Sequence, residues 1–204
     1  MKKVGSVIIL VAVMFCASFA QEPTGNTYLN SAIGFEITKP DGWVFLTAAK
    51  VDSIIAGSDK SAREDEMLKY LSAPLVTIAK YRNPAQPFNP NFRVSLDSLG
   101  MLRQLNMVEM LKIMSGSFAE AFNDFESVVD PEEIEVSGIK SAHSVFNLST
   151  QMPDSSTVVL TTEYWVVPRG AYYFAIVASS EKSDTTGTRE KFQEIIESVK
   201  ISKE

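Results

Sequence analysis

The sequence predicts an α+β fold in which an antiparallel β-sheet is flanked by helices on both faces. Three observations indicate this fold class. Apolar residues alternate in several short segments but take a helical period over 101–122 and again over 189–200. Turn residues separate three consecutive strand-like segments between 139 and 178, as in an antiparallel meander. The segment 172–177 is apolar throughout, which is typical of a strand covered on both faces.

The first 20 residues have the three parts of a secretory signal sequence. Two lysines form a positive n-region, and an apolar run follows from Val7 to Phe15. Ser18 and Ala20 place small side chains at the −3 and −1 positions of a cleavage site before Gln21. We therefore expect cleavage between Ala20 and Gln21, export to the periplasm or the extracellular space, and no membrane span in the mature chain.

A lipoprotein signal is the alternative interpretation of this segment, because Cys16 stands near its end. Phe15 is bulky at a position where such signals have a small residue, so we expect no lipid anchor at Cys16. Cys16 is the only cysteine of the chain. The mature protein then has no thiol, and its stability depends on a hydrophobic core without a disulfide.

The composition of the mature chain indicates one acidic domain. Removal of residues 1–20 leaves 17 basic and 25 acidic side chains, a formal charge of −8. Such a surface repels phosphate backbones, so we expect no nucleic-acid partner. The remaining length is sufficient for one core. We assign residues 21–29 to a loose leader and residues 30–204 to a single globular domain that we expect to be a monomer.

Strands and one helix are predicted in the first half of the domain. The alternating segment 34–37 predicts a strand that ends at a turn. Helix-forming residues predict a helix over 61–71, with Ser61 as its cap. Further strands are predicted over 75–81 and 92–96, and the loop between them holds three prolines.

Two amphipathic helices and a meander are predicted in the second half. The helix over 101–122 has an apolar arc formed by Met107, Met110, Leu111, Met114, Phe118, Ala121 and Phe122. The strands are predicted over 133–136, 139–150, 157–167 and 171–178. The closing helix over 189–200 has an apolar stripe of Phe192, Ile195, Ile196 and Val199.

Four short segments of the sequence are similar to PsbP-like domains, including bacterial extracytoplasmic members of unknown function. The segments are Gly34-Phe35-x-Ile37-x-x-Pro40-x-Gly42-Trp43, Val136-x-Gly138-x-x-Ser141-Ala142, and the pair Tyr172-Tyr173-Phe174 with Phe192-x-x-Ile195-x-x-Ser198-Val199-Lys200-Ile201. The resemblance spans most of residues 30–201. It implies an α/β/α sandwich around an antiparallel sheet. It carries no catalytic residues, because members of the family mostly serve in binding and assembly.

No constellation of catalytic, cofactor-binding or metal-ligating residues is predicted. His143 is the only histidine, and the serines beside it in a predicted strand point to the opposite face. There is no Gly-x-Ser-x-Gly elbow, and one histidine without cysteine is too few for a zinc site. The acidic segment 124–135 lacks the spacing of a calcium loop and is interpreted as a solvated turn. We therefore predict no cofactor.

The methionines at 107, 110 and 114 have a spacing that could ligate Cu(I) on one helical face. The same arc contains Leu111 and Phe118, so we interpret these methionines as part of the core. Burial should protect them from oxidation, and we expect mild peroxide to modify Met152 well before these three.

Phe88 and Trp165 are the candidates for an exposed apolar contact surface. The leading hypothesis is a non-catalytic extracytoplasmic binding or accessory domain with an unknown protein or small-molecule partner. One alternative is a structural partner in an envelope or secreted complex, which requires that exposed surface. The other is an enzyme that uses carboxylates alone, which requires a cleft holding a carboxyl group of raised pKa.

Overall fold

The structure of the protein is a computed structural model. It describes residues 23, 25–46, 74–82, 88–122, 124–152 and 155–202. The expected signal sequence, its cleavage site and the helix expected over 61–71 lie outside the described residues, as does most of the proline-containing loop. Among the described helices, none has the length and apolar character needed to cross a bilayer.

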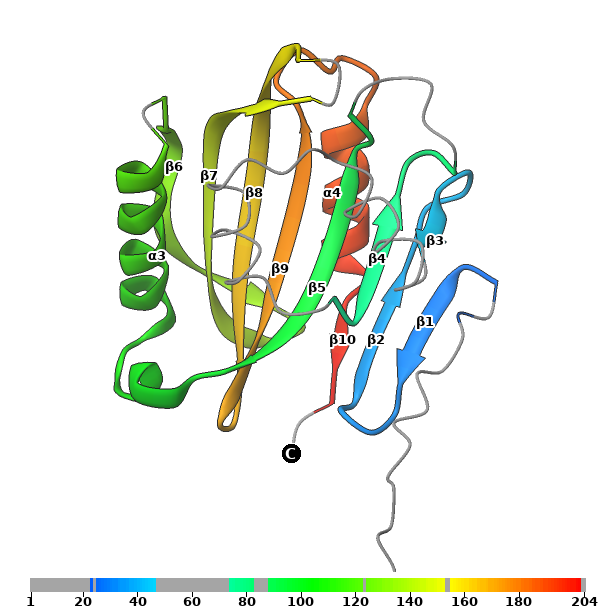
Figure 1. The fold of residues 1–204 in the computed structure, drawn as a ribbon. Coiled ribbons are helices and arrows are strands. Elements are labelled where there is room, and N and C mark those ends of the chain that lie inside the picture. Colours follow the sequence, from blue (N-terminus) through cyan, green and yellow to red (C-terminus); the bar gives the residue numbers. More distant parts are fainter. Residues whose placement is uncertain are drawn as a thin grey trace, which may run out of the picture.

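Seven strands form the larger sheet, and each pairs antiparallel with its neighbours (Figure 1). Their spatial order is β3-β4-β5-β9-β8-β7-β6. The strands are β3 (Val44–Leu46), β4 (Val76–Ala79), β5 (Asn91–Ser98), β6 (Glu126–Val136), β7 (Ile139–Gln151), β8 (Thr157–Arg169) and β9 (Tyr172–Glu181). Strands β7, β8 and β9 form the predicted meander. The predicted α+β class and its antiparallel sheet are confirmed.

A smaller sheet joins the N-terminal strands to the end of the chain. Its antiparallel strands, in spatial order, are β1 (Thr27–Asn30), β2 (Phe35–Thr38) and β10 (Lys200–Ile201). Gly34 precedes β2 with φ +59°, and its carbonyl accepts a hydrogen bond of 2.9 Å from the backbone N–H of Ser202. A Cβ atom at Gly34 would lie 1.9 Å from Oγ of Ser202. The positive φ therefore favours glycine, and a larger residue would also displace the Ser202 hydroxyl.

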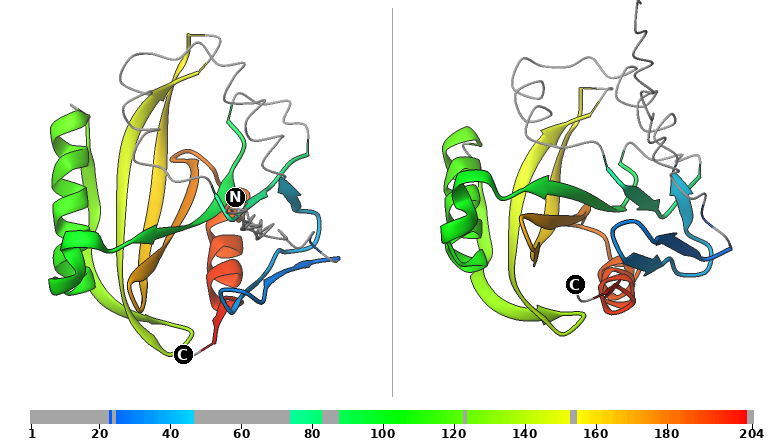
Figure 2. Two further views of the ribbon diagram at one scale, coloured as in Figure 1. Left: turned by 60° about the horizontal axis from the view of Figure 1, so that its bottom comes forward. Right: turned by 90° about the horizontal axis from the view of Figure 1, so that it is seen from below.

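Helix α4 (Thr188–Glu197) contacts strands of both sheets, β2 and β9 (Figure 2). The predicted apolar stripe is buried at all four positions. The ring of Phe192 lies 5.9 Å from that of Trp43 and 6.3 Å from that of Phe92. The stripe belongs to a cluster of buried side chains that we name the α4 cluster; its other large members are Tyr28, Phe35, Ile37, Trp43, Ile78, Phe92, Trp165, Phe174 and Ile176.

Helix α3 (Met107–Ala121) packs on β6, β7 and β8. It begins with a capping box, in which the N–H of Glu109 donates to Oδ1 of Asn106 at 2.9 Å and the Asn106 N–H donates to Oε2 of Glu109 at 3.1 Å. Its buried residues belong to a second cluster, the α3 cluster, which consists of Leu99, Met110, Leu111, Ala142, Phe146, Leu148, Tyr164, Val166 and Ala175.

Strand β8 shows how one strand serves both clusters. Tyr164 and Val166 belong to the α3 cluster, whereas Trp165 and Val167 belong to the α4 cluster. Successive side chains of a strand point to opposite faces, so the alternation follows from the extended backbone. All four residues are buried, which explains why β8 is apolar without interruption from Tyr164 to Val167.

Several boundaries differ from those predicted. Strand β1 begins at Thr27, within the segment assigned to a loose leader, because it pairs with β2. The helix predicted over 101–122 is divided into a 3-10 helix, η1 (Gly100–Gln104), and α3. The acidic segment is not a turn but the edge strand β6, interrupted by bulges before Val129 and before Glu132. The closing helix ends at Glu197, because the next residues pair with β2 as β10.

Candidate functional site

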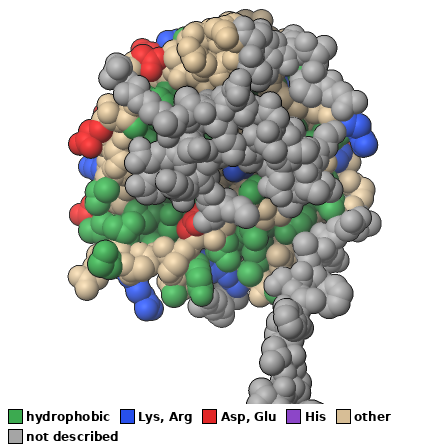
Figure 3. All heavy atoms as spheres, in the orientation of Figure 1, with side chains coloured by type: hydrophobic (Ala, Val, Ile, Leu, Met, Phe, Trp, Pro, Cys, Tyr) green, Lys and Arg blue, Asp and Glu red, His purple; other side chains and the backbone are tan. Residues whose placement is uncertain are grey.

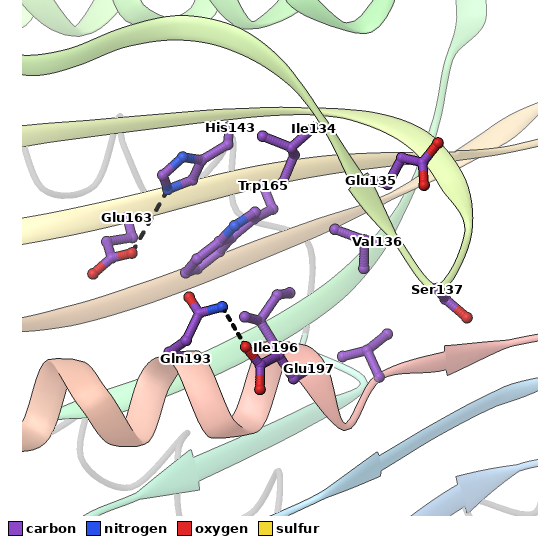
Figure 4. Close-up of a pocket in the computed structure, with 11 residues that line it drawn as sticks. Ile134, Glu135, Val136, Ser137, His143, Glu163, Trp165, Gln193, Ile196 and Glu197 are labelled. Carbon is purple, nitrogen blue, oxygen red and sulfur yellow. Dashed lines mark hydrogen bonds and ion pairs between the residues drawn. The ribbon is translucent and has the colours of Figure 1, made fainter.

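A cavity of about 460 Å³ lies between α4 and the strands β6, β7 and β8 (Figure 4). Its volume is within the range of sites for small molecules. Polar and apolar residues both line it: Ile134, Glu135, Val136, Ser137, His143, Glu163, Trp165, Gln193, Ile196, Glu197 and Val199. We take this cavity as the candidate functional site.

The turn between β6 and β7 closes one end of the cavity. Ser137 and Gly138 have φ values of +55° and +71°, as a two-residue type I′ hairpin requires. The backbone N–H of Ile201 donates to Oγ of Ser137 at 3.0 Å. This hydrogen bond joins the turn to β10, so the hairpin is held next to the end of α4.

His143 lies inside the cavity wall rather than on the outer surface. Its imidazole stacks on the indole of Trp165, its cross-strand partner, with ring centroids 5.0 Å apart and an interplanar angle of 24°. Figure 4 shows Trp165 between this imidazole and α4. Nδ1 lies 3.6 Å from Oε1 of Glu132, and Nε2 lies 3.6 Å from Oε2 of Glu163. Nε2 is buried and has no hydrogen-bond partner among the described residues.

The carboxylates around the cavity are unequally balanced by positive charge. The Glu163 side chain is 12% exposed, and its Oε1 lies 3.2 Å from Nε of Arg189. Glu197 accepts a hydrogen bond of 2.8 Å from Nε2 of Gln193 and makes no ion pair within the described residues. Glu135 is the cross-strand partner of Lys140. Its side chain leaves β6 on the face opposite to those of Ile134 and Val136, so Glu135 borders the cavity without pointing into it.

This arrangement can bind a polar group but offers no activated nucleophile among the described residues. The Ser137 hydroxyl accepts the Ile201 N–H, and Ser144 lies on the face opposite to His143, as predicted from the strand. No group of three potential metal ligands occurs in the part of the chain that the structure describes. The groups available to a ligand are therefore carboxylates, one imidazole, one amide and an apolar floor.

The contact surface predicted at Trp165 is not formed, and most of the loop that carries Phe88 lies outside the described residues. Trp165 is only 3% exposed, because the alternation along β8 directs it into the α4 cluster. Phe88 is half-buried just before β5 and does not belong to that cluster. The expectation of an exposed apolar patch at Trp165 was wrong, although its indole lines the cavity.

The methionines of α3 pack as the sequence predicts for a core. Met110 is completely buried, and Met107 and Met114 are partly buried against the α3 cluster. Met101, in η1, is 98% exposed, whereas Met152 is partly buried. Met101 should therefore be oxidised even before Met152.

Sequence analysis did not identify most of the residues that line the cavity. One usable signal was Glu163, the single acidic residue of β8, which directly precedes the apolar run from Tyr164 to Val167. Another was the pair Gln193 and Glu197, four positions apart on α4 and therefore on one side of the helix. Neither signal indicates which strands face α4, so the site could not be assembled from them.

No known family model matches the sequence, and no curated protein matches it. Solved structures do resemble it. LpqN of Mycobacterium tuberculosis, described as involved in cell envelope biogenesis, aligns with a TM-score of 0.53 and 16% identity over 83% of each chain. The cyanobacterial PsbP (CyanoP) of Synechocystis sp. PCC 6803 aligns with a TM-score of 0.52 and 11% identity over 86% of this chain and 91% of its own. The fold is PsbP-like.

A further solved structure with this fold has no assigned function. It is PA94 of Pseudomonas aeruginosa, described as a putative regulator, with a TM-score of 0.51 and 8% identity over 63% of this chain and 83% of its own. The PsbP-like resemblance inferred from four short segments is thus confirmed at the level of the fold. Identities this low carry over no ligand, partner or catalytic role.

Proposed function

We propose that the protein is an exported, non-catalytic binding or accessory domain whose ligand occupies the cavity beside α4. The observation that carries this proposal is the cavity itself, which combines an apolar floor at Trp165 and Ile196 with the polar groups of His143, Glu163 and Glu197. Small-molecule sites combine apolar lining with polar groups that orient the ligand, and this cavity offers both kinds of residue. The N-terminal signal sequence supports export, and the involvement of LpqN in envelope biogenesis is compatible with such a location.

The observations favour binding over catalysis by carboxylates. Burial raises the pKa of Asp97, which a hydrogen bond from Ser95 partly offsets. Asp97 lies on β5 and does not line the cavity. A general acid needs both a raised pKa and access to substrate, and this carboxyl group lies outside the cavity. The cavity therefore supports recognition of a ligand better than its hydrolysis.

A role as a structural partner requires an exposed apolar surface other than Trp165. Hydrophobic side chains gather in the lower part of the face shown in Figure 3. Among the described residues, Met101 and Tyr172 are large and exposed, and a hydrogen bond of 2.9 Å from the Leu99 N–H to the Ala171 carbonyl joins their segments. Scattered exposure of this kind is common on monomers, so we rank this function second.

A ligand screen with a cavity-filling variant tests the proposed function. The mature protein should bind members of a fragment library, with NMR shift changes at Trp165 and His143. Ile196→Phe should abolish these changes, because the larger side chain fills the cavity. Val159→Phe, at a partly exposed site on β8 away from the cavity, is the matched control. Fragments that bind Ile196→Phe and the parent equally would exclude the cavity as the site.

Export is tested by the intact mass of the secreted protein. A mature chain that begins at Gln21 agrees with the proposal. A chain that begins at a lipidated Cys16 would instead place the domain on a membrane.

A further inference from the structure

We infer that the tip of the β6–β7 hairpin, residues 133–141, is a lid that swings away from α4 to admit a ligand to the cavity. The inference rests on the proposed function, since it names the route by which the ligand enters. Three observations lead to it: the enclosure of the cavity, the lack of a third strand beside the hairpin tip, and the single hydrogen bond that holds this tip. We call residues 133–141 the lid.

The apolar side chains that line the cavity are closed off from solvent. Trp165 and Ile196 are 3% and 7% exposed, and Val136 and Val199 are each 3% exposed. A ligand can contact these side chains only after one wall of the cavity has moved, as in proteins whose sites are covered by a lid.

The walls of the cavity are held with unequal strength. Strand β8 is paired on both sides, with β7 and with β9. Helix α4 buries its whole apolar stripe in the α4 cluster. The lid forms strand pairs only between its own two halves, β6 and β7. A two-stranded ribbon is marginally stable without further packing, so the lid is the wall that opens at the lowest cost.

The lid lacks a third strand because β7 separates from β8. The last pair of the β7–β8 ladder is Ala142 with Val166, so residues 139–141 have no partner on β8 within the described residues. If the ladder continued, Pro168 would lie opposite Lys140, and proline has no N–H to donate. Figure 2 shows the lid curving away from β8 toward α4.

The lid has a hinge at its base and a latch at its tip. The bulges of β6 before Val129 and before Glu132 interrupt the regular ladder where the lid begins. At the tip, Oγ of Ser137 accepts the N–H of Ile201 (Figure 4). Among the described residues, this is the only hydrogen bond from the lid to an element other than β6 and β7. Apolar contacts with the α4 cluster hold the rest, and a ligand can contact the same side chains when the lid closes over it.

Thiol labelling tests whether the lid opens. The expected mature chain has no cysteine, so single cysteines can be placed in it. Val136→Cys is on the lid, Val199→Cys is on α4 within the cavity, and Val94→Cys is completely buried in the same cluster but does not line the cavity. Cysteine packs as a small apolar residue, and unfolding midpoints check that each variant is folded.

N-ethylmaleimide, followed by mass spectrometry, should modify Val136→Cys and Val199→Cys at least about tenfold faster than Val94→Cys. Opening of the lid uncovers its own side chain and the side chain on α4 together. Equal rates at all three positions would overturn the inference. Fast labelling of Val199→Cys alone would show that α4 moves instead, and fast labelling of Val136→Cys alone would show that the hairpin frays without opening the cavity; either result would also overturn it.

Loss of the latch should speed the opening. Ser137→Ala should raise the labelling rates of Val136→Cys and Val199→Cys by roughly threefold to tenfold, because the hydrogen bond at the tip is lost, and should leave that of Val94→Cys unchanged. Ser155→Ala is the control, because Ser155 also has a positive φ, +65°, but does not line the cavity. An equal increase with Ser155→Ala, or an equal increase at Val94→Cys, would show general loosening and overturn the latch.

The labelling experiment uses no ligand, so its outcome is independent of the fragment screen. Bound fragments together with equal labelling rates would retain the cavity as the site and overturn the lid. Labelling in the expected order without any bound fragment would retain the lid and count against the proposed function.

Discussion

The two helices of the described chain are held in opposite ways. Helix α3 has a local start signal, the capping box of Asn106 and Glu109, but buries completely only Met110 and Leu111. Helix α4 starts at Thr188, after Gly187, which provides no side-chain cap, yet its whole apolar stripe is buried. Local signals therefore set where α3 begins, whereas distant contacts set where α4 begins.

The start of α4 is fixed by residues that are far apart in sequence. Lys80, at the end of β4, donates to the Thr188 hydroxyl at 2.7 Å and also to that of Thr186. Thr188 in turn donates to Oδ2 of Asp184 at 2.5 Å. At the other end of the helix, the Ser198 hydroxyl accepts from the N–H of Thr38 and donates to its carbonyl. The network explains how a helix without a local cap has defined ends.

Core truncation should separate the two helices most clearly. Phe192→Ala is expected to lower the free energy of unfolding by about 3–5 kcal/mol, because its ring is fully buried among other rings. Met114→Ala on α3 should cost only about 1–2 kcal/mol, because that side chain is partly exposed. Urea unfolding of both variants measures the difference. Equal losses would show that the two layers are packed alike.

Substitution of Asp184 should affect α4 and alter the response to acid. Burial raises the pKa of Asp184, but the hydroxyls of Thr186 and Thr188 and the charge of Lys80 outweigh it, so the pKa is lowered. The stability that the Asp184 carboxylate contributes is present above pH 3.8, the ordinary pKa of the group, and is lost as the pH falls below that value. Asp184→Asn should cost about 1.5–3 kcal/mol at neutral pH.

The measurement is the free energy of unfolding from pH 7 to pH 3. Asp184→Asn should flatten the decline between pH 4 and pH 3 relative to the parent protein. Asp41→Asn, at an exposed turn where Asp41 accepts from Asn26, is the control. A parallel decline in Asp184→Asn and the parent would contradict the assigned role of Asp184.

The α3 layer should respond to alkali instead. Burial raises the pKa of Tyr164 well above its usual range, with smaller contributions from Tyr173 and Asp97. Folding then favours the neutral phenol, so its contribution is complete below pH 10 and is lost as pH rises further. Because Tyr164 ionises in the unfolded chain but not in the folded one, the free energy of unfolding of the parent protein should fall by about 1.4 kcal/mol at pH 11, one unit above the ordinary pKa. The free energy of unfolding, measured at pH 9 and at pH 11, should not show this loss in Tyr164→Phe. A loss in the variant as large as that in the parent would contradict the role of Tyr164.

Removal of the α3 cap should have the smallest effect. Asn106→Ala is expected to cost about 1 kcal/mol, because the N–H of Glu109 loses its acceptor. Asn106→Asp keeps an acceptor oxygen and should be nearly neutral in thermal unfolding. If both variants lost the same stability, the capping hydrogen bond would not be the cause.

Periodicity predicted most of the elements but little of the site. The stripe of Phe192, Ile195 and Ile196 is readable because the helical period is a local property of the chain. Strand β10 is not readable, because two residues form a strand only when β2 lies beside them. The same limit applies to His143, whose neighbours Glu132 and Glu163 come from two other strands.

The sequence by itself determined the fold class and the helical and strand periods of most elements. These properties depend on residues within a few positions of one another, where backbone geometry alone sets the relation. Only the tertiary structure decided that Trp165 is buried, that α4 is anchored by Lys80, and that a cavity forms beside His143. Each depends on strand order and register, which bring together residues that chain spacing leaves unrelated.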